Sequence, residues 1–170
     1  MTLGRAFIEA AKRRPSAFCM ADSTGQELTF ARALTAALLL SGAIRRTTAG
    51  QQYVGLLLPA SVGGALANVA TSLAGKVPVN LNFTAGHDAM AAAIERCGIK
   101  TILTARAFVA KAGIEAIDGM VFVEDFLKSI PLTTKLRTAL AVKTLPASLL
   151  ARSYAAGTPP CPRCSCYGWR

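Results

Sequence analysis

The feature that most constrains the fold is a charge-free stretch over 53–75, YVGLLLPASVGGALANVATSLAG. It is long enough to cross a bilayer as a single helix, but Pro59, Ser61 and two glycines interrupt it. YVGLLL has the length and apolar composition of a buried strand, whereas the following residues repeat apolar side chains at helical spacing. We therefore predict a buried strand over 53–58, a short loop and a packed helix over 62–73, rather than a transmembrane span.

The same alternation of short apolar strands and helices continues along the chain as far as Asp125. The other expected elements are a helix over 3–14 capped by Thr2, a hairpin over 17–22 and 26–30, a helix over 30–44 capped by Thr29, a strand over 75–81, a helix over 86–97 capped by Thr84 and ended by Gly98, a strand over 100–105, a helix over 106–113 and a strand over 119–125. The expected core-facing residues are Leu3, Phe7, Ile8 and Ala11, then Phe30, Leu34, Leu38 and Ile44, then Val62, Leu66, Val69 and Leu73. This alternation predicts an α/β fold, with a parallel sheet flanked by helices on both faces.

Beyond Asp125 the strand pattern stops. The segment FLKSIPLTTKLRTALAVKTLPASLLARSYAA reads as helix broken at Pro131 and Pro146, more typical of a connecting arm than of a domain core. We therefore divide the chain into a partial α/β domain over 1–130, a helical arm over 131–156 and an aberrant or disordered Cys/Pro-rich tail over 157–170.

The net charge of +10 at pH 7 raises the possibility of an anionic partner. Many of the cations stand at expected helix ends, such as Lys12 to Arg14 and Arg45–Arg46, where they suit the helix dipole. No recognition helix or basic stripe with interleaved aromatics is present, so we expect no nucleic acid as a partner. The basic residues of the arm could favour an acidic partner or a membrane surface.

Met1 leads directly into an amphipathic pattern rather than an apolar run, which predicts no signal peptide. We expect a cytoplasmic protein, with contact to the inner face of the cell membrane as an option. In that reducing compartment, Cys19 and Cys97 are interpreted as small buried hydrophobic residues.

Several segments in order resemble the start of the adenylate-forming (AMP-binding) superfamily, which includes acyl-CoA synthetases, acyl-ACP synthetases and peptide-synthetase adenylation domains. They are ELTFARAL, GQQYVGLLLPAS, SLAGKVPVNLNFTAG and AMAAAIERCGIKTILTA. The segments GKVPVNLNFTAG, RAFVAKAG and VFVEDF are most similar to the acyl-ACP synthetase / 2-acylglycerophosphoethanolamine acyltransferase type. The resemblance implies the N-terminal portion of the large domain of such an enzyme.

The resemblance also implies an acid–thiol ligase of fatty acid and lipid metabolism. Such an enzyme uses ATP and Mg²⁺ to form an acyl-adenylate and passes the acyl group to an acyl carrier protein or to CoA. The family's phosphate loop, S-S-G-S-T-G-x-P-K-G, is absent from this sequence, and so are the acidic metal region and the lid lysine that the family places further on. We therefore expect a fragment that is inactive alone and binds neither ATP nor Mg²⁺ tightly, and we assign no catalytic, cofactor-binding or metal residues.

Other candidate residues have plain structural interpretations. Gly63–Gly64 lack the spacing of a phosphate-cradling loop, and Asn80 and Asn82 are more typical of turns. Glu124 and Asp125 would point to opposite faces of the expected strand, so a cap or a solvated edge is expected rather than a paired-carboxylate site. The only histidine, His87, is expected at the surface or as a capping residue.

The final residues, GTPPCPRCSCYGWR, contain Cys161, Cys164 and Cys166. Their C-x-x-C spacing leaves open an alternative, a small α/β binding module with a zinc-binding tail. A structural zinc site needs four ligands, and no fourth ligand is nearby in the sequence. We therefore favour out-of-frame or terminal sequence over a zinc or redox site.

Overall fold

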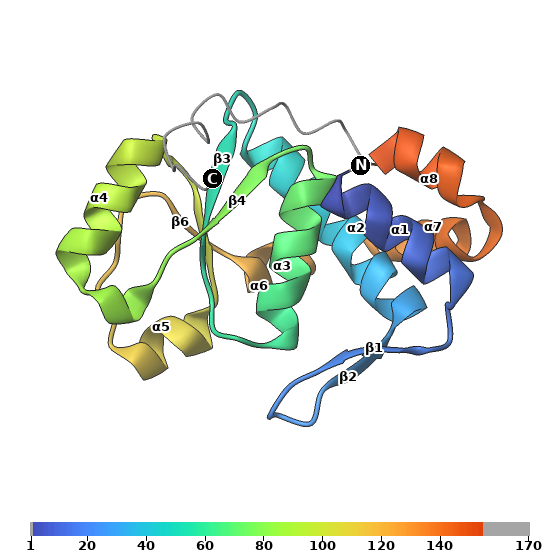
Figure 1. Cartoon of the computed structure of the whole chain (residues 1–170), viewed down its shortest axis with the longest axis horizontal. Coiled ribbons are helices and arrows are strands. Elements are labelled where there is room, and N and C mark those ends of the chain that lie inside the picture. The colour runs from blue at the N-terminus through green and yellow to red at the C-terminus, as the bar shows by residue number, and fades with distance from the viewer. Residues whose placement is uncertain (1, 155–170) are drawn as a thin grey trace, which may run out of the picture.

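A four-stranded parallel sheet with the order β4-β3-β5-β6 forms the centre of the computed structural model, which describes residues 2–154 (Figure 1). The strands are β3 (Tyr53–Leu57), β4 (Val77–Asn80), β5 (Ile102–Thr104) and β6 (Met120–Phe122). The helices α3 (Val62–Leu73), α4 (His87–Cys97) and α5 (Arg106–Ala112) connect consecutive strands. The predicted α/β architecture is confirmed, as is the division of the charge-free stretch into strand, loop and helix. None of the described helices is long and apolar enough to cross a membrane.

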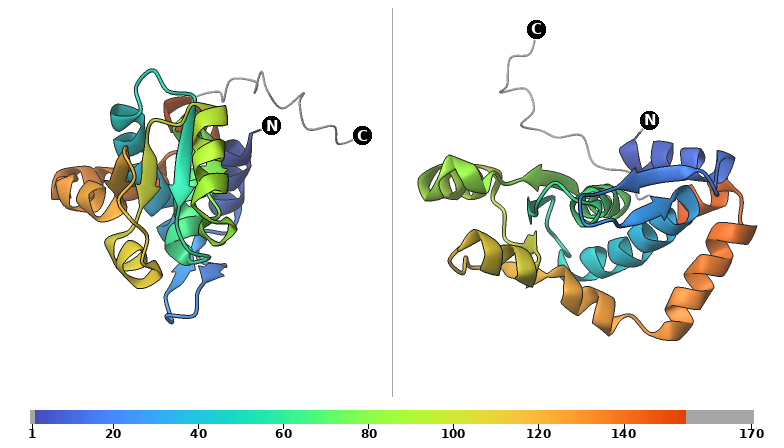
Figure 2. Two further views of the ribbon diagram at one scale, coloured as in Figure 1. Left: turned by 90° about the vertical axis from the view of Figure 1, so that its left-hand side faces the viewer. Right: turned by 90° about the horizontal axis from the view of Figure 1, so that it is seen from below.

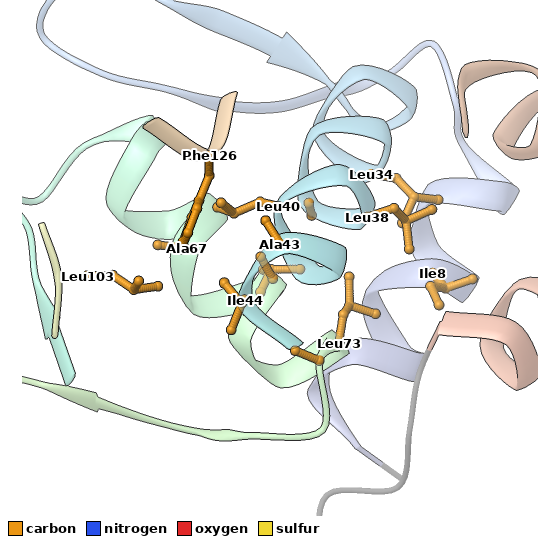
Figure 3. Packing of buried hydrophobic residues seen from close by; sticks show 14 of the residues in the cluster. Ile8, Leu34, Leu38, Leu40, Ala43, Ile44, Ala67, Leu73, Leu103 and Phe126 are labelled. Atoms are coloured by element: carbon orange, nitrogen blue, oxygen red, sulfur yellow. The ribbon is translucent and has the colours of Figure 1, made fainter. Parts of the chain in front are cut away.

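Two hydrophobic clusters cover the two faces of the sheet. The larger joins α1 (Leu3–Arg13), α2 (Phe30–Thr47) and α3 to Leu103 (Figure 3). The smaller contains Leu57, Met90 and Ile102, on the side of α4 and α5. Because neighbouring residues of a strand point to opposite faces, Ile102 and Leu103 serve different clusters although both are almost fully buried.

A separate antiparallel hairpin precedes the sheet. It consists of β1 (Phe18–Ala21) and β2 (Glu27–Thr29) and extends from one end of α2 (Figure 1). The caps on either side of it are as predicted. Thr2 Oγ1 accepts a hydrogen bond from the Arg5 backbone N at 3.4 Å, and Thr29 Oγ1 accepts one from the Arg32 N at 3.5 Å. These hydroxyls satisfy amide groups that have no partner inside the helix.

The C-terminal part of the described chain forms α6 (Val123–Ser129), α7 (Leu132–Thr144) and α8 (Ala147–Tyr154). The helix is broken next to both prolines, as predicted, but the segment also packs onto the rest of the fold. Helix α7 lies against α2 and α8 lies against α1 (Figure 2). Val142 and Leu150 join the larger cluster, and Lys12 Nζ donates to the Val142 carbonyl at 2.8 Å. The broken helix therefore contributes to the core.

The structure corrects the predicted caps and strand bounds in two places. The strand expected over 119–125 ends at Phe122, and Glu124 and Asp125 lie in the first turn of α6. Thr84 does not cap α4. It lies in the 3-10 helix η1 (Phe83–Ala85), which is capped by Asn82, whereas α4 starts after Gly86, whose φ of 88° bends the chain between the two helices.

Two predictions of burial are also wrong. Leu3 is 58% exposed, because Gly4, Ile8 and Ala11 form the buried face of α1 and Leu3 is rotated away from it. Cys19 and Cys97 are half-buried rather than buried. Cys19 belongs to β1, whose residues are all exposed or half-buried. Partial burial still raises the pKa of its thiol.

Candidate functional site: the carboxyl edge of the sheet

An open depression of about 490 Å³ lies beyond the carboxyl ends of β3 and β4. Its lining residues come from the hairpin, the β3–α3 connection, α3 and the end of β4: Met20, Ala21, Asp22, Leu58, Pro59, Ala60, Ser61, Val62, Gly64, Ala65, Asn68 and Asn80. From β3 the chain continues to β4 on one side, whereas β5 and β6 lie on the other side. Open parallel sheets commonly bind ligands near such a reversal of strand order, so this edge is the candidate site.

The β3–α3 connection is shaped by Ser61 and Gly64. Ser61 is the N-cap of α3, and its Oγ accepts a hydrogen bond from the Gly64 backbone N at 3.2 Å. A Cβ atom at Gly64 would lie 2.4 Å from the Pro59 carbonyl oxygen, closer than any real contact. Gly63 has no such constraint, because its Cβ would meet only Ser61 Oγ at 3.7 Å. Gly64 therefore allows the backbone of the loop to approach the helix.

Asp22, at the end of β1, reaches across to the start of α3. Its Oδ2 accepts a hydrogen bond from the Val62 backbone N at 3.0 Å, and its Oδ1 accepts one from the Thr24 N at 3.0 Å. The Thr24 hydroxyl also donates to Asp22 Oδ1. This bond and then the one from the Val62 N are the largest causes that hold the pKa of the Asp22 carboxyl below its usual value. A carboxylate thus occupies the electropositive end of α3.

This arrangement does not fit a phosphate cradle. Two of the first three backbone amides of α3 are already bonded, Val62 N to Asp22 and Gly64 N to Ser61. A phosphate at the same helix end would also face the negative charge of Asp22. These contacts occupy two of the backbone amides that a phosphate at Gly63–Gly64 would need.

On the other side of the depression, Asn68 of α3 and Asn80 of β4 form a reciprocal amide pair. Each Nδ2 donates to the other residue's Oδ1 at 3.0 Å, and Asn68 Nδ2 also lies 3.1 Å from the Gly64 carbonyl oxygen. The pair joins α3 to the end of β4. Asn80 was interpreted as a turn residue, but it ends a strand and lines the depression.

A second polar group lies beyond β5 and β6. Glu124 Oε1 accepts a hydrogen bond from the Arg106 backbone N at 2.9 Å and so caps α5 from another helix. Asp125 Oδ2 lies 2.7 Å from Arg106 Nη2, and the guanidinium stacks 4.1 Å above the centre of the Phe122 ring. Both carboxylates therefore bind Arg106 and do not form a paired-carboxylate site. Glu124 caps a helix, and Asp125 forms an exposed ion pair.

The remaining candidate residues do not join either group. His87 and Asp88 are exposed in the first turn of α4, with His87 Nδ1 3.7 Å from Asp88 Oδ1. Within residues 2–154, no three His, Cys, Asp or Glu side chains lie close enough to hold a metal ion. Cys161, Cys164 and Cys166 lie outside the described residues.

The sequence profile of the AMP-binding enzyme family matches residues 7–160, nearly the whole chain. This chain belongs to the AMP-binding enzyme family. The matched segment includes the β3–α3 loop, the Asn68–Asn80 pair and the Arg106 group.

Several solved structures share the fold at low identity. The N-terminal domain of FACL13 from Mycobacterium tuberculosis superposes with a TM-score of 0.63 at 16% identity, over 77% of this chain and 36% of that one. The nonribosomal peptide synthetase FmoA3 superposes with a TM-score of 0.66 at 18% identity, over 76% and 14%. The N-terminal subdomain of NpsA from Klebsiella oxytoca gives 0.65 at 11%, over 76% and 32%. The chain thus spans about a third or less of the length of these structures.

Sequence reasoning missed Asp22 and Asn68 as residues of this edge. Asp22 followed by Ser23 and Thr24 signals only a turn, and its partner Val62 is forty residues away along the chain. Asn68 lies in a helix whose apolar spacing predicts packing alone. The one available signal for this pair was a polar amide inside an apolar helix, Asn68, followed by another at the end of the next strand, Asn80.

Proposed function

We propose that this AMP-binding chain is the N-terminal part of the acyl-activating domain of an acyl-ACP synthetase, with acyl-CoA synthetase as the close alternative. The family match over residues 7–160 carries the proposal. The assignment to the acyl-ACP synthetase branch is supported by the residues of GKVPVNLNFTAG, RAFVAKAG and VFVEDF. We propose a partial AMP-binding domain over 1–130, a helical arm over 131–156 whose helices α7 and α8 pack on that domain, and a tail over 157–170 that is not part of the functional fold.

In the intact enzyme, a fatty carboxylate would attack the α-phosphate of Mg-ATP, giving acyl-adenylate and releasing pyrophosphate. A phosphopantetheine thiol, on an acyl carrier protein or on CoA, would then take the acyl group and release AMP. Charge builds up on phosphate oxygens during the first step, so the active site must supply cations and backbone donors there. We expect those groups in the loop downstream of this chain and not at the start of α3, where the Asp22 carboxylate lies.

This chain's own contribution is therefore structural. The parallel sheet and its two clusters form the scaffold, and the Asn68–Asn80 pair and the Asp22 contact shape one wall of a site that the rest of the enzyme would complete. We expect the chain alone neither to bind Mg-ATP tightly nor to form acyl-adenylate.

The deciding experiment is to sequence the DNA that follows the Arg170 codon and to translate it in every reading frame. We expect the Ser/Thr/Gly-rich loop that ends in P-K-G to appear shortly downstream. Its absence over a long stretch of downstream sequence would contradict the proposal.

A biochemical experiment then separates the two acceptors. The 170-residue chain is compared with a version extended by the downstream reading frame that encodes the loop, in fatty-acid-dependent ATP–pyrophosphate exchange, and only the extended version is expected to be active. Transfer to acyl carrier protein in preference to CoA would support the acyl-ACP branch, and the reverse preference would assign the enzyme to acyl-CoA synthetases. Exchange activity of the short chain alone would show that the catalytic groups are present after all.

A further inference from the structure

Large exposed hydrophobic side chains are concentrated on the last three described helices. Of the eight most exposed in residues 2–154, five lie between Leu127 and Leu149. Three belong to α7, where Leu132, Leu136 and Leu140 are 71%, 63% and 62% exposed. Single exposed leucines are ordinary on protein surfaces, but a cluster marks an interaction surface.

The three leucines form one stripe along α7. Residues four apart advance by about 40° around a helix, so Leu132, Leu136 and Leu140 share one side. Thr138 and Val142 are buried on another side, where α7 packs against α2. Figure 2 shows α7 along an outer edge of the molecule, away from the sheet. The stripe therefore faces outward because the packed face of the helix is already used.

All charged side chains of this segment are positive. From Leu127 to Ser153 the charged residues are Lys128, Lys135, Arg137, Lys143 and Arg152, and the segment contains no Asp or Glu. Arg137 and Lys143 are exposed and belong to α7 itself, and Lys128 and Arg152 are exposed on α6 and α8. The nearest acidic residue before it, Asp125, is already paired with Arg106.

We propose that α7 docks this protein on an anionic lipid bilayer, with Leu132, Leu136 and Leu140 inserted at the boundary between headgroups and acyl chains and the surrounding cations bound to lipid phosphates. Apolar residues on one face with lysine and arginine beside them are what an interfacial helix requires. Long basic side chains can reach headgroups while leucines enter the acyl region. The absence of any acidic residue in the segment favours an anionic bilayer over a protein surface of mixed charge.

The contact would lie in the plane of the interface. No described helix can cross a membrane, and α7 has only 13 residues with one face packed against α2. Binding would therefore be reversible and would depend on both the leucines and the charges. This inference does not require ligase activity, but it requires that the rest of the proposed enzyme leaves the stripe uncovered.

The test uses the full 170-residue chain in a sedimentation assay. One set of vesicles contains phosphatidylcholine mixed with phosphatidylglycerol, and the other contains phosphatidylcholine alone. We expect sedimentation with the anionic vesicles at low salt, less at high salt, and little with the neutral vesicles. Replacing Leu132, Leu136 and Leu140 together by Gln should weaken the partition by at least about tenfold.

Two matched controls use residues elsewhere on the surface. Leu3→Gln removes a leucine that is 58% exposed on α1 and should leave binding unchanged. The pair Lys135→Gln and Arg137→Gln should weaken binding to anionic vesicles, whereas Arg45→Gln with Arg46→Gln, at the end of α2, should have a smaller effect. Circular dichroism checks that each variant folds. If the triple leucine variant does not fold, the single change Leu136→Gln replaces it in the sedimentation assay.

A second readout tests insertion directly. A Leu136→Trp variant, in a chain that carries Trp169→Phe to remove the only other tryptophan, should show a blue-shifted emission when anionic vesicles are added. The proposal is overturned if the chain does not bind anionic vesicles, if the leucine variants bind as well as the parent, or if the emission of the Leu136→Trp variant does not shift. It is also overturned if the leucine changes instead abolish a dimer measured by analytical ultracentrifugation, because the stripe would then belong to a second copy.

Discussion

The Asp22 carboxylate accepts a hydrogen bond from the Val62 backbone N at 3.0 Å and thereby fastens the N-terminal hairpin to the start of α3. Helix α3 is therefore capped twice, by Ser61 at its own N-terminus and by Asp22 from the hairpin. The contact orders one wall of the depression at the carboxyl edge of the sheet. It also places negative charge at the position where many α/β proteins bind phosphate.

The Asp22 contact should make stability depend on pH. The pKa of Asp22 is lowered in the folded protein, so its stabilising effect is present above the unfolded pKa and is lost as the pH falls through the folded pKa, below about pH 4. Asp22→Asn should lower the melting temperature at neutral pH, and this difference should shrink in acid. Thermal unfolding followed by circular dichroism measures both, with the exposed Glu115→Gln as control. A difference that is constant with pH would contradict the assignment.

Replacing each of the two neighbouring glycines at the start of α3 by alanine should have different effects on the free energy of unfolding. Gly64→Ala places a Cβ 2.4 Å from the Pro59 oxygen and should destabilise the protein by about 1–3 kcal/mol. Gly63→Ala meets only an ordinary contact of 3.7 Å and should leave stability unchanged or raise it by up to about 1 kcal/mol. Urea unfolding gives the two free energies. Equal effects would show that the loop does not approach the helix as described.

The burial of α8 is tested by two adjacent leucines. Leu150 is fully buried in the larger cluster, and Leu150→Ala should cost about 2–5 kcal/mol in the free energy of unfolding. Leu149 is 46% exposed, and Leu149→Ala should change it by no more than about 0.5 kcal/mol. If urea unfolding gave a small effect for both, α8 would not be part of the cooperative core.

The carboxylates around Arg106 should differ in their contribution to stability. Glu124→Ala removes the acceptor of the Arg106 backbone N at the start of α5 and should cost about 0.5–2 kcal/mol. Asp125→Ala breaks an ion pair whose side chains are 57% and 49% exposed, and should cost less than about 1 kcal/mol. Chemical denaturation compares the two variants. A larger loss for Asp125→Ala would reverse the roles assigned here.

Local patterns predicted most of the elements. The strand–loop–helix division at 53–73, the caps Thr2 and Thr29, and the left-handed Gly98 at the end of α4 are all confirmed. Each depends on residues within a few positions of one another, so the sequence carries the information directly. The resemblance to the AMP-binding family rests on the order of such segments, and the match of the family profile to residues 7–160 confirms it.

The errors arose where local patterns conflict or a distant segment decides. The run MVFVEDFL suits a strand as well as a helix, and the Glu124 and Asp125 contacts to Arg106 favour the helix that follows Phe122. Thr84 was expected to cap α4, but its backbone N donates a hydrogen bond to Asn82 Oδ1, and Gly86 occupies the N-cap position of α4. The same competition between nearby polar residues recurs wherever several potential caps follow one another.

The order of strands and helices, the parallel sheet and the family follow from local patterns, because periodicity, capping and turn residues act over short distances. The bond from Val62 to Asp22, the Asn68–Asn80 pair and the burial of Leu150 beside an exposed Leu136 are visible only in the folded chain. These relationships join residues brought together by packing, and no local pattern in the sequence distinguishes a buried leucine of the arm from an exposed one.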